Sequence, residues 1–525
     1  MSRPIPLALG SACALAALMI AAPAMAQSNI VTMNTVQIFG TIDPAKVNDY
    51  TEYMAAVNLY DALVTVDAGG NILPQLAESW EVSEDSSVFT FTLNPDATFQ
   101  DGSPVTADDV VYSVDRLLSI NQGPAYLFAD VLEPGSVQAT DDHTVVFTLS
   151  QTFSPFLATM PAVFIVNADL VQENAGDDEG QTYLATNVAG AGPYMLDSWD
   201  RGSRMTLTRD ENYYGGWHEG AIDEVRWIVT NDEATVRSLA ASGELTMTSQ
   251  YQATETYDAI AAMDGFYLAE EDTAVAYYYK INTQIPPTDD VHVRRAIACA
   301  TDYDLIREII LPGGVLSTPL PPLFAEFHND DIPAPVFDLE CAREEMAQSR
   351  YADSGPIPIV HSYVAGTAFQ EEIALLFQAT MEELGFDVTL QPEPWNRVTE
   401  LAAEIDTTPN LTQVFFGPTY PSPDSMFYTQ YHSNAAGTWA SMEWVLNDEV
   451  DSLIDAARAT ADVDEQAEIY RELQALLVEI QPDTFLLTQR VRHAMSDCLT
   501  GFQAIPMQSF DYDMYRYTWT CDPNG

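Results

Sequence analysis

The side chains in this sequence whose types and places suit chemistry are aromatic rings on turns rich in glycine and proline. Trp395 follows a proline, Tyr420 lies in the run FFGPTYPSPD at residues 415–424, and Trp439 follows shortly after a glycine. Rings held on ordered loops can stack on a ligand in a concave site. We predict that seven residues bind a ligand: Tyr53, Tyr251, Trp395, Phe416, Thr419, Tyr420 and Trp439. The alternative is that these rings only pack between the parts of the fold.

The sequence lacks the usual signatures of catalysis. It contains no G-x-S-x-G turn, no H-E-x-x-H motif, no phosphate-binding glycine loop and no dinucleotide fingerprint. The seven histidines stand singly, and the 78 acidic residues guarantee carboxylate pairs by chance, so we predict neither a metal centre nor a general acid and base. We therefore predict a binding protein that is not an enzyme and has no cofactor. A secreted hydrolase is the rival class.

The charge of the chain is strongly negative. Its 525 residues include 78 acidic and 20 basic side chains, for a formal net charge of −58, and only Lys46 and Lys280 are lysines. Such a chain repels polyanions, so no nucleic acid is predicted as a partner. At molar salt the Debye length falls to about 3 Å and self-repulsion is screened. The composition therefore predicts an acidic surface adapted to a saline environment, with simple anionic solubility as the alternative.

The N-terminus has the layout of a cleaved secretory signal, which we place at residues 1–26. Arg3 precedes an apolar run over residues 7–22, and an A-x-A site precedes Gln27. We therefore predict a periplasmic protein; lipidation of Cys13 is the alternative.

Export would leave four cysteines in an oxidising compartment, which favours two disulfides. We predict the pairs Cys299–Cys341 and Cys498–Cys521, because neighbours in sequence close the shorter loops. A zinc site is the rival, but no C-x-x-C motif supports it.

The elements that must position these residues alternate between strands and helices. Residues 87–93 and 144–149 alternate polar and apolar side chains, which predicts two half-buried antiparallel strands. Thr106 caps a predicted helix, and residues 369–384 form another that leads into a strand at 386–390. Further helices are predicted over three stretches: 290–309 with a break at 301–302, 449–458, and 465–480. This pattern indicates a mixed α/β protein with several lobes.

Several motifs, in order, resemble those of the extracellular solute-binding protein family 5, the peptide- and nickel-type receptors of ATP-binding cassette (ABC) importers. The resemblance runs from about residue 31 onward. The motifs that carry it are YDAL at 60–63, LPQLAESW at 73–80, the strand at 89–93, FQDGSPVTADDV at 99–110, GAGPY at 190–194, RDENY at 209–213, VHVRRAIACA at 291–300 and LIDAAR at 453–458.

The resemblance implies an α/β fold of the class C periplasmic binding protein type, with two α/β lobes, a hinge, and an extra domain inserted in lobe one. Mapped by motif, lobe one takes residues 27–59, 190–284 and 498–525, the extra domain takes 60–189, and lobe two takes 285–497. Asn282 and Pro286 would lie at the hinge. The implied function is to capture a solute between the lobes, as a monomer, and to deliver it to the membrane permease and ATPase subunits of an importer.

The ligand is predicted to be a peptide or a polar organic solute of similar size. Family members that bind a free α-amino group resemble one another in carrying an aspartate in the loop that corresponds to residues 417–420 here. The matching position in this sequence is Thr419. A neutral hydroxyl cannot pair with an ammonium group, so oligosaccharides, opines and other modified amino acids are alternatives, as are the nickel and haem ligands of the family. A receptor that feeds chemotaxis or signalling would share the same binding chemistry.

Overall fold

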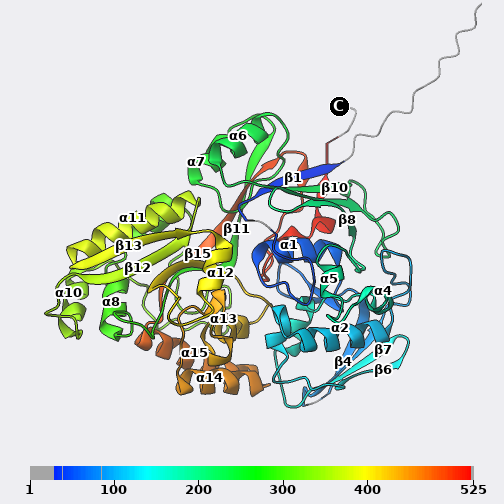
Figure 1. Ribbon diagram of the computed structural model, residues 1–525, viewed down its shortest axis with the longest axis horizontal. Coiled ribbons are helices and arrows are strands. Elements are labelled where there is room, and N and C mark those ends of the chain that lie inside the picture. Colours follow the sequence, from blue (N-terminus) through cyan, green and yellow to red (C-terminus); the bar gives the residue numbers. More distant parts are fainter. Residues whose placement is uncertain (1–28, 38, 84, 522–525) are drawn as a thin grey trace, which may run out of the picture.

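The computed structural model describes residues 29–37, 39–83 and 85–521; the predicted signal at residues 1–26, with Cys13, lies outside them. Lobe one is built on a four-stranded sheet, at the upper right in Figure 1. Its strands, in sheet order, are β1 (Ile30–Thr35), β10 (Glu224–Val229), β9 (Arg204–Arg209) and β8 (Tyr194–Asp200). The helices of this lobe are α1 (Tyr50–Leu59), α6 (Glu233–Ala241) and α7 (Thr254–Ala261).

A second four-stranded sheet forms the extra domain below lobe one (Figure 1). Its strands, in sheet order, are β4 (Ala77–Val82), β5 (Val88–Leu93), β7 (Thr144–Thr148) and β6 (Val137–Asp141). The smaller elements are β2 (Val64–Val66), β3 (Ile72–Pro74), α2 (Ala107–Ile120), α3 (Phe156–Thr159), α4 (Ala168–Asn174) and α5 (Gln181–Leu184). Strands β5 and β7 pair antiparallel, as their alternating side chains predict.

Lobe two is built on a five-stranded mixed sheet, at the left in Figure 1. Its strands, in sheet order, are β13 (Phe386–Glu393), β12 (Ile357–Val364), β14 (Leu411–Phe416), β11 (Phe266–Ile281) and β15 (Asp483–Ser496). Its helices are α8 (Val291–Cys299), α9 (Tyr303–Leu305), α10 (Leu339–Gln348), α11 (Ala368–Glu383), α12 (Trp395–Leu401), α13 (Pro423–Tyr431), α14 (Asp448–Ala459) and α15 (Val463–Ile480). The residue boundaries predicted between the lobes remain predictions.

Two long strands connect the lobes. Strands β11 and β15 pair antiparallel along most of their lengths and run between the two lobes in Figure 1. Their register shifts between Asp272 and Ala276, where the ladder is interrupted. Such an irregularity bends a strand locally and leaves backbone unpaired. The crossing between lobes therefore coincides with the weakest point of the ladder.

The residues predicted at the hinge lie elsewhere. Asn282 and Pro286 follow the end of β11, on the side of lobe two. Asn282 is buried, and its Nδ2 donates hydrogen bonds to the carbonyl oxygens of Ile405 at 3.0 Å and Thr408 at 3.1 Å. These bonds tie Asn282 to lobe two, whereas the interruption of the ladder lies at residues 272–276; the hinge role of Asn282 and Pro286 stays a prediction.

Both predicted disulfides are confirmed. Cys299 at the end of α8 bonds to Cys341 in α10, and Cys498 bonds to Cys521. The second bond lies beside the short pair of β16 (Leu499–Thr500) and β17 (Thr518–Trp519). It closes a segment that packs back on lobe one, where the Trp519 N–H donates to the carbonyl oxygen of Gly220 at 2.7 Å.

Candidate functional site

A cavity lies where the two lobes meet. It encloses about 980 Å³ between protein atoms, its open mouth included. Lobe one contributes the end of β1, the first turn of α1 and a 3-10 turn at Phe510–Tyr512; lobe two contributes β14 and the loop after it. The interrupted part of β11 lies between them, since Thr273, Ala274 and Val275 line the cavity. A site built on the crossing strands is placed to change shape when the lobes move.

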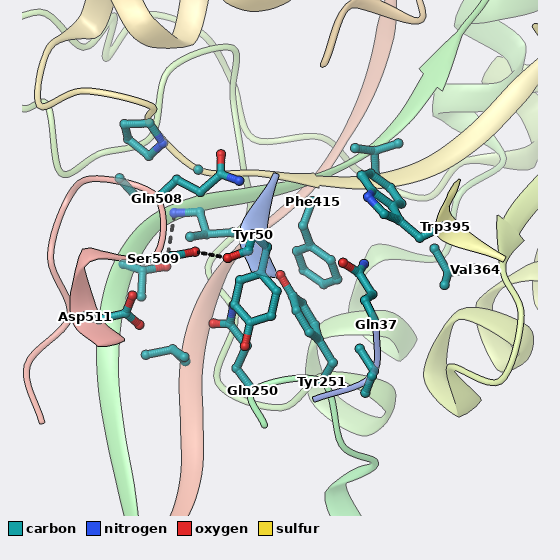
Figure 2. A pocket seen from close by; sticks show the side chains of 18 of the residues that line it. Gln37, Tyr50, Gln250, Tyr251, Val364, Trp395, Phe415, Gln508, Ser509 and Asp511 are labelled. Atoms are coloured by element: carbon teal, nitrogen blue, oxygen red, sulfur yellow. Dashed lines mark hydrogen bonds between the residues drawn. The ribbon is translucent and has the colours of Figure 1, made fainter. Parts of the chain in front are cut away.

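Aromatic rings from both lobes meet in this cavity (Figure 2). On the side of lobe one, the rings of Tyr50 and Tyr251 make an edge contact with centroids 5.2 Å apart. Tyr251 also lies 5.7 Å from the ring of Phe415 in β14. On the side of lobe two, Trp395 and Trp439 lie 5.3 Å apart. Tyr251, Trp395 and Trp439 therefore line the cavity as predicted, while their binding role remains a prediction.

Two other predicted ring residues lie outside this cavity, and their binding role stays a prediction. Phe416 is fully buried and packs 5.9 Å from Trp439, because successive side chains of a strand point to opposite faces and its neighbour Phe415 takes the cavity side. Tyr53 lies on α1, is 3% exposed, and packs with its ring centroid 6.3 Å from that of Phe164, in a core that lobe one shares with the extra domain. Neither residue lines the cavity.

The loop after β14 also differs from its prediction. Thr419 is buried, and its backbone N–H and hydroxyl both bond to the hydroxyl of Ser425, at 2.7 and 2.9 Å. The Tyr420 hydroxyl donates to the carboxylate of Asp424 at 2.6 Å, and its fully buried ring belongs to the core cluster of lobe one and the extra domain. The chain turns inward after Pro418, so Gly417 and Pro418 line the cavity and Thr419 and Tyr420 do not. An acid at position 419 would face Ser425 rather than a ligand.

Strand β14 offers an open backbone edge to the cavity. It pairs with β12 only at Leu411 and Thr412, so its following residues have no strand partner on that side. The N–H of Asn282 donates to the carbonyl of Asn410, so these two residues form a hydrogen-bonded pair of the antiparallel ladder. Hydrogen-bonded and non-hydrogen-bonded pairs alternate along such a ladder. Counting from that pair, the backbone groups of Phe415 point away from Tyr277 on β11 and toward the open side. An extended ligand could therefore add to this edge as a strand.

The lobes are in contact around the cavity. The indole N–H of Trp395 donates to Asp49 at 3.1 Å, and the backbone N–H of Gln508 donates to the carbonyl of Pro418 at 2.7 Å. On the far side, the N–H of Ser154 in the extra domain donates to the carbonyl of Arg458 at 3.0 Å. Burial raises the pKa of Asp49, and the tryptophan bond opposes that rise. The structure thus shows the lobes closed on each other.

The important residues that sequence patterns missed come from segments far apart in the chain. Tyr50, Phe415, Gln508 and Asp511 line the cavity without any shared motif. Burial raises the pKa of Asp511 to about 7. No pattern could have found it, because Asp511 reaches the cavity only through the return of the chain to lobe one.

Two further features of the fold concern metal binding and membrane spans. Among the described residues, no three histidine, cysteine, aspartate or glutamate side chains gather in a way that could hold a metal ion. Across the same residues, no helix is both long and apolar enough to cross a membrane.

Comparison with known proteins then decides the family. A model of the bacterial extracellular solute-binding proteins, family 5 Middle, matches residues 71–438. The chain belongs to this family. The resemblance drawn from the motifs is therefore confirmed, and the family consists of solute-binding transport proteins.

Among its relatives, this family 5 protein is 28% identical over 476 residues to a probable D,D-dipeptide-binding periplasmic protein, DdpA, of Escherichia coli (strain K12). That match covers 89% of this chain and 90% of DdpA.

Solved structures confirm the class C fold. The periplasmic binding protein DppA from Helicobacter pylori, solved with the peptide STSA, aligns with a TM-score of 0.85 at 20% identity, over 94% of this chain and 98% of DppA. The oligopeptide-binding protein AppA from Bacillus subtilis, solved with a nonapeptide, aligns with a TM-score of 0.83 at 19% identity, over 94% and 99% of the two chains.

Proposed function

We propose that this family 5 protein is a periplasmic receptor that captures a peptide between its lobes and delivers it to an ABC importer. The observation that carries the proposal is the open edge of β14 in a cavity with aromatic walls. A peptide that adds to a strand edge gains main-chain hydrogen bonds whatever its side chains are. The names of DdpA, DppA and AppA, which all refer to peptides, support the same ligand class.

Capture follows from the two-lobe geometry. In the open protein a solute would meet one lobe first, and closure at residues 272–276 would bring the other lobe onto it. A ligand that contacts both lobes favours the closed state by as much as it binds that state better. The closed surface is what the permease would recognise, and ATP hydrolysis belongs to the separate ATPase subunit. We propose that the receptor acts as a monomer.

Two measurements test this proposal. Ligand released by denaturing protein purified from its native periplasm should have the mass and fragmentation pattern of a peptide; a sugar or an opine would contradict it. Methylating the one peptide nitrogen that faces β14 should weaken binding of a tripeptide by about tenfold or more, the scale of a lost buried hydrogen bond. Methylating the nitrogen that faces away is the matched control and should have a smaller effect.

A further inference from the structure

The cavity has an unbalanced set of polar groups. Among the described residues that line it, Asp511 is the one with a charged side chain, and no lysine, arginine or histidine joins it. The other polar side chains are amides and hydroxyls, mainly five glutamines: Gln37, Gln250, Gln370, Gln413 and Gln508. The cavity therefore offers negative charge to a ligand and no cationic side chain.

The carboxylate of Asp511 has no side-chain partner within the described part of the chain and is bonded by its own backbone N–H. No side chain there forms an ion pair or a hydrogen bond with it, and the Tyr517 hydroxyl bonds only to its backbone oxygen, at 2.7 Å. Its neighbour Asp513 shows the contrast, since the guanidinium of Arg516 lies 2.9 Å from that carboxylate. Figure 2 shows Asp511 beside the cavity, on the side where Ser509 and Gln508 lie.

Two glutamines add unpaired acceptors to the same cavity. The Oε1 atoms of Gln37 and Gln508 are buried, and neither has a hydrogen-bond partner among the described residues. Gln508 lies three positions before Asp511, and Gln37 follows β1. Buried acceptors without donors cost stability. Because they face the cavity, these acceptors are free to accept hydrogen bonds from donors of a ligand.

We propose that Asp511 holds the protonated amine of the ligand and that the ligand brings no free carboxylate into the cavity. This inference deepens the proposed function and rests on it: the substrate class becomes peptide-like solutes with a free amine and a blocked or absent carboxylate. The amine site lies on lobe one, whereas Thr419, which stands where other members of the family carry their amine-binding aspartate, lies in the loop after β14.

Hydrogen-bond chemistry supports this assignment. An ammonium group carries three donors and no acceptor. Asp511 supplies a charged acceptor, and bonds between ionised groups are about twice as strong as neutral ones. A ligand carboxylate would lose its hydration without gaining a cation, which makes its burial costly. The cavity should therefore favour ligands with a free amine and disfavour ligands with a free carboxylate.

Calorimetric titration of the full protein in molar salt with four forms of trialanine tests both halves of the proposal. The forms are the free tripeptide, its C-terminal amide, its N-acetyl derivative and the doubly blocked compound. We expect the amide to bind about tenfold more tightly than the free tripeptide, and N-acetylation to weaken binding by about tenfold to a hundredfold. N-acetyl forms that bind as well as the amines would overturn the amine site. A free tripeptide that binds as well as its amide would overturn the exclusion of carboxylates.

A matched pair of variants ties the effect to one residue. Asp511→Asn should abolish the preference for the free amine and leave the doubly blocked form unaffected. Asp497→Asn removes the same charge from an exposed position and should keep the preference. An amine preference that survives in Asp511→Asn would contradict the assignment.

Phenethylamine and 2-phenylethanol separate this inference from the proposed function. If the tripeptides fail to bind but the amine binds better than the alcohol in an Asp511-dependent way, the amine site stands and the peptide function falls. If the four trialanine forms, phenethylamine and 2-phenylethanol all fail to bind, both the amine site and the peptide function are overturned.

Discussion

Two acidic sites in this protein, one fully buried and one half-buried at the cavity, have opposite surroundings. In the interior of lobe two, the ammonium of Lys280 pairs with Glu443 and donates to Gln430 at 2.9 Å, and the side chains of both members of the pair are fully buried. Asp483 lies in the same cluster, where it accepts from the Tyr431 hydroxyl at 2.6 Å. Asp511 has no such cation (Figure 2). A buried acid that the fold has already paired is structural, whereas one that the fold leaves unpaired at a cavity is available to a ligand.

Removing the cation from the paired site should have the largest effect. Lys280→Met would leave Glu443 and Asp483 buried together, and burial already raises the pKa of each. We expect a loss of about 3–5 kcal/mol in the free energy of unfolding, the usual cost of breaking a buried pair. Denaturant unfolding in molar salt measures it.

The other lysine provides the control. Lys46 is partly exposed, and its ammonium lies 3.3 Å from the amide oxygen of Gln181. Lys46→Met should change the free energy of unfolding by less than about 1 kcal/mol. Equal losses in the two variants would remove the distinction between a paired core site and an ordinary surface charge.

Trp395 tests the cavity side of the comparison. Its ring is half-buried, contacts Trp439 and donates to Asp49. Trp395→Ala should weaken peptide binding by roughly 1–3 kcal/mol, the scale of an aromatic anchor, and change the melting temperature little. Trp199→Ala, which removes a ring stacked on Arg201 away from the cavity, should leave affinity unchanged. Unchanged affinity with a large loss of stability would place Trp395 in the core instead.

The pH dependence of stability should distinguish the unpaired acid. Burial raises the pKa of Asp511 to about 7, so the folded protein keeps the proton that the unfolded chain releases near pH 4. The stabilising contribution of the protonated Asp511 side chain is therefore complete below pH 4, and this contribution is lost as pH rises to about 7. Asp511→Asn lacks this loss, so without ligand it should be more stable than the parent above pH 7, by roughly 1–2 kcal/mol because the half-buried side chain can still reach water.

Unfolding measured in parallel at pH 4, 6 and 8 provides the check. The same side chain is faced by the phenols of Tyr50, Tyr251, Tyr512 and Tyr517, whose pKa values burial raises, so they stay neutral over this range. A stability difference between variant and parent that does not change with pH would show that folding does not raise the pKa of Asp511.

Salt should change the stability of the protein through its surface charges and not through either acidic site. The net charge of −58 predicts a melting temperature several degrees lower at tens of millimolar salt than at molar salt, because repulsion is then less screened. The same decrease should appear in Asp511→Asn, and the difference between parent and variant should be the smallest effect of this set. A melting temperature that rises on dilution would contradict adaptation to salt.

Sequence patterns predicted the parts of the fold that local chemistry determines. Helix α2 begins after Thr106, whose N–H bonds to the carboxylate of Asp109 at 2.9 Å, as a capping pattern requires. The predicted break in residues 290–309 falls between α8 and α9, where Asp302 caps the second helix. Both disulfides followed from proximity in sequence.

The cavity was harder to predict, because its geometry depends on long-range packing. A shift of one residue along β14 moved the ring that faces the cavity from Phe416 to Phe415. Tyr53 has a plausible type but lies on the core face of α1. Asp511 lies in a 3-10 turn that no periodic pattern marks, and its role depends on the absence of a cation nearby.

The cavity joins residues from near the two ends of the sequence, and this determines when it can exist during synthesis. The hydroxyls of Tyr50 and Tyr512 lie 3.0 Å apart although the residues are 462 positions apart in the sequence, and the Ser509 hydroxyl donates to the carbonyl of Tyr50 at 2.8 Å. Contacts between such distant residues form late, because a long loop must close first. A chain that reaches only as far as β14 lacks the wall that carries Asp511. A nascent receptor therefore cannot hold a ligand until synthesis has passed residue 512.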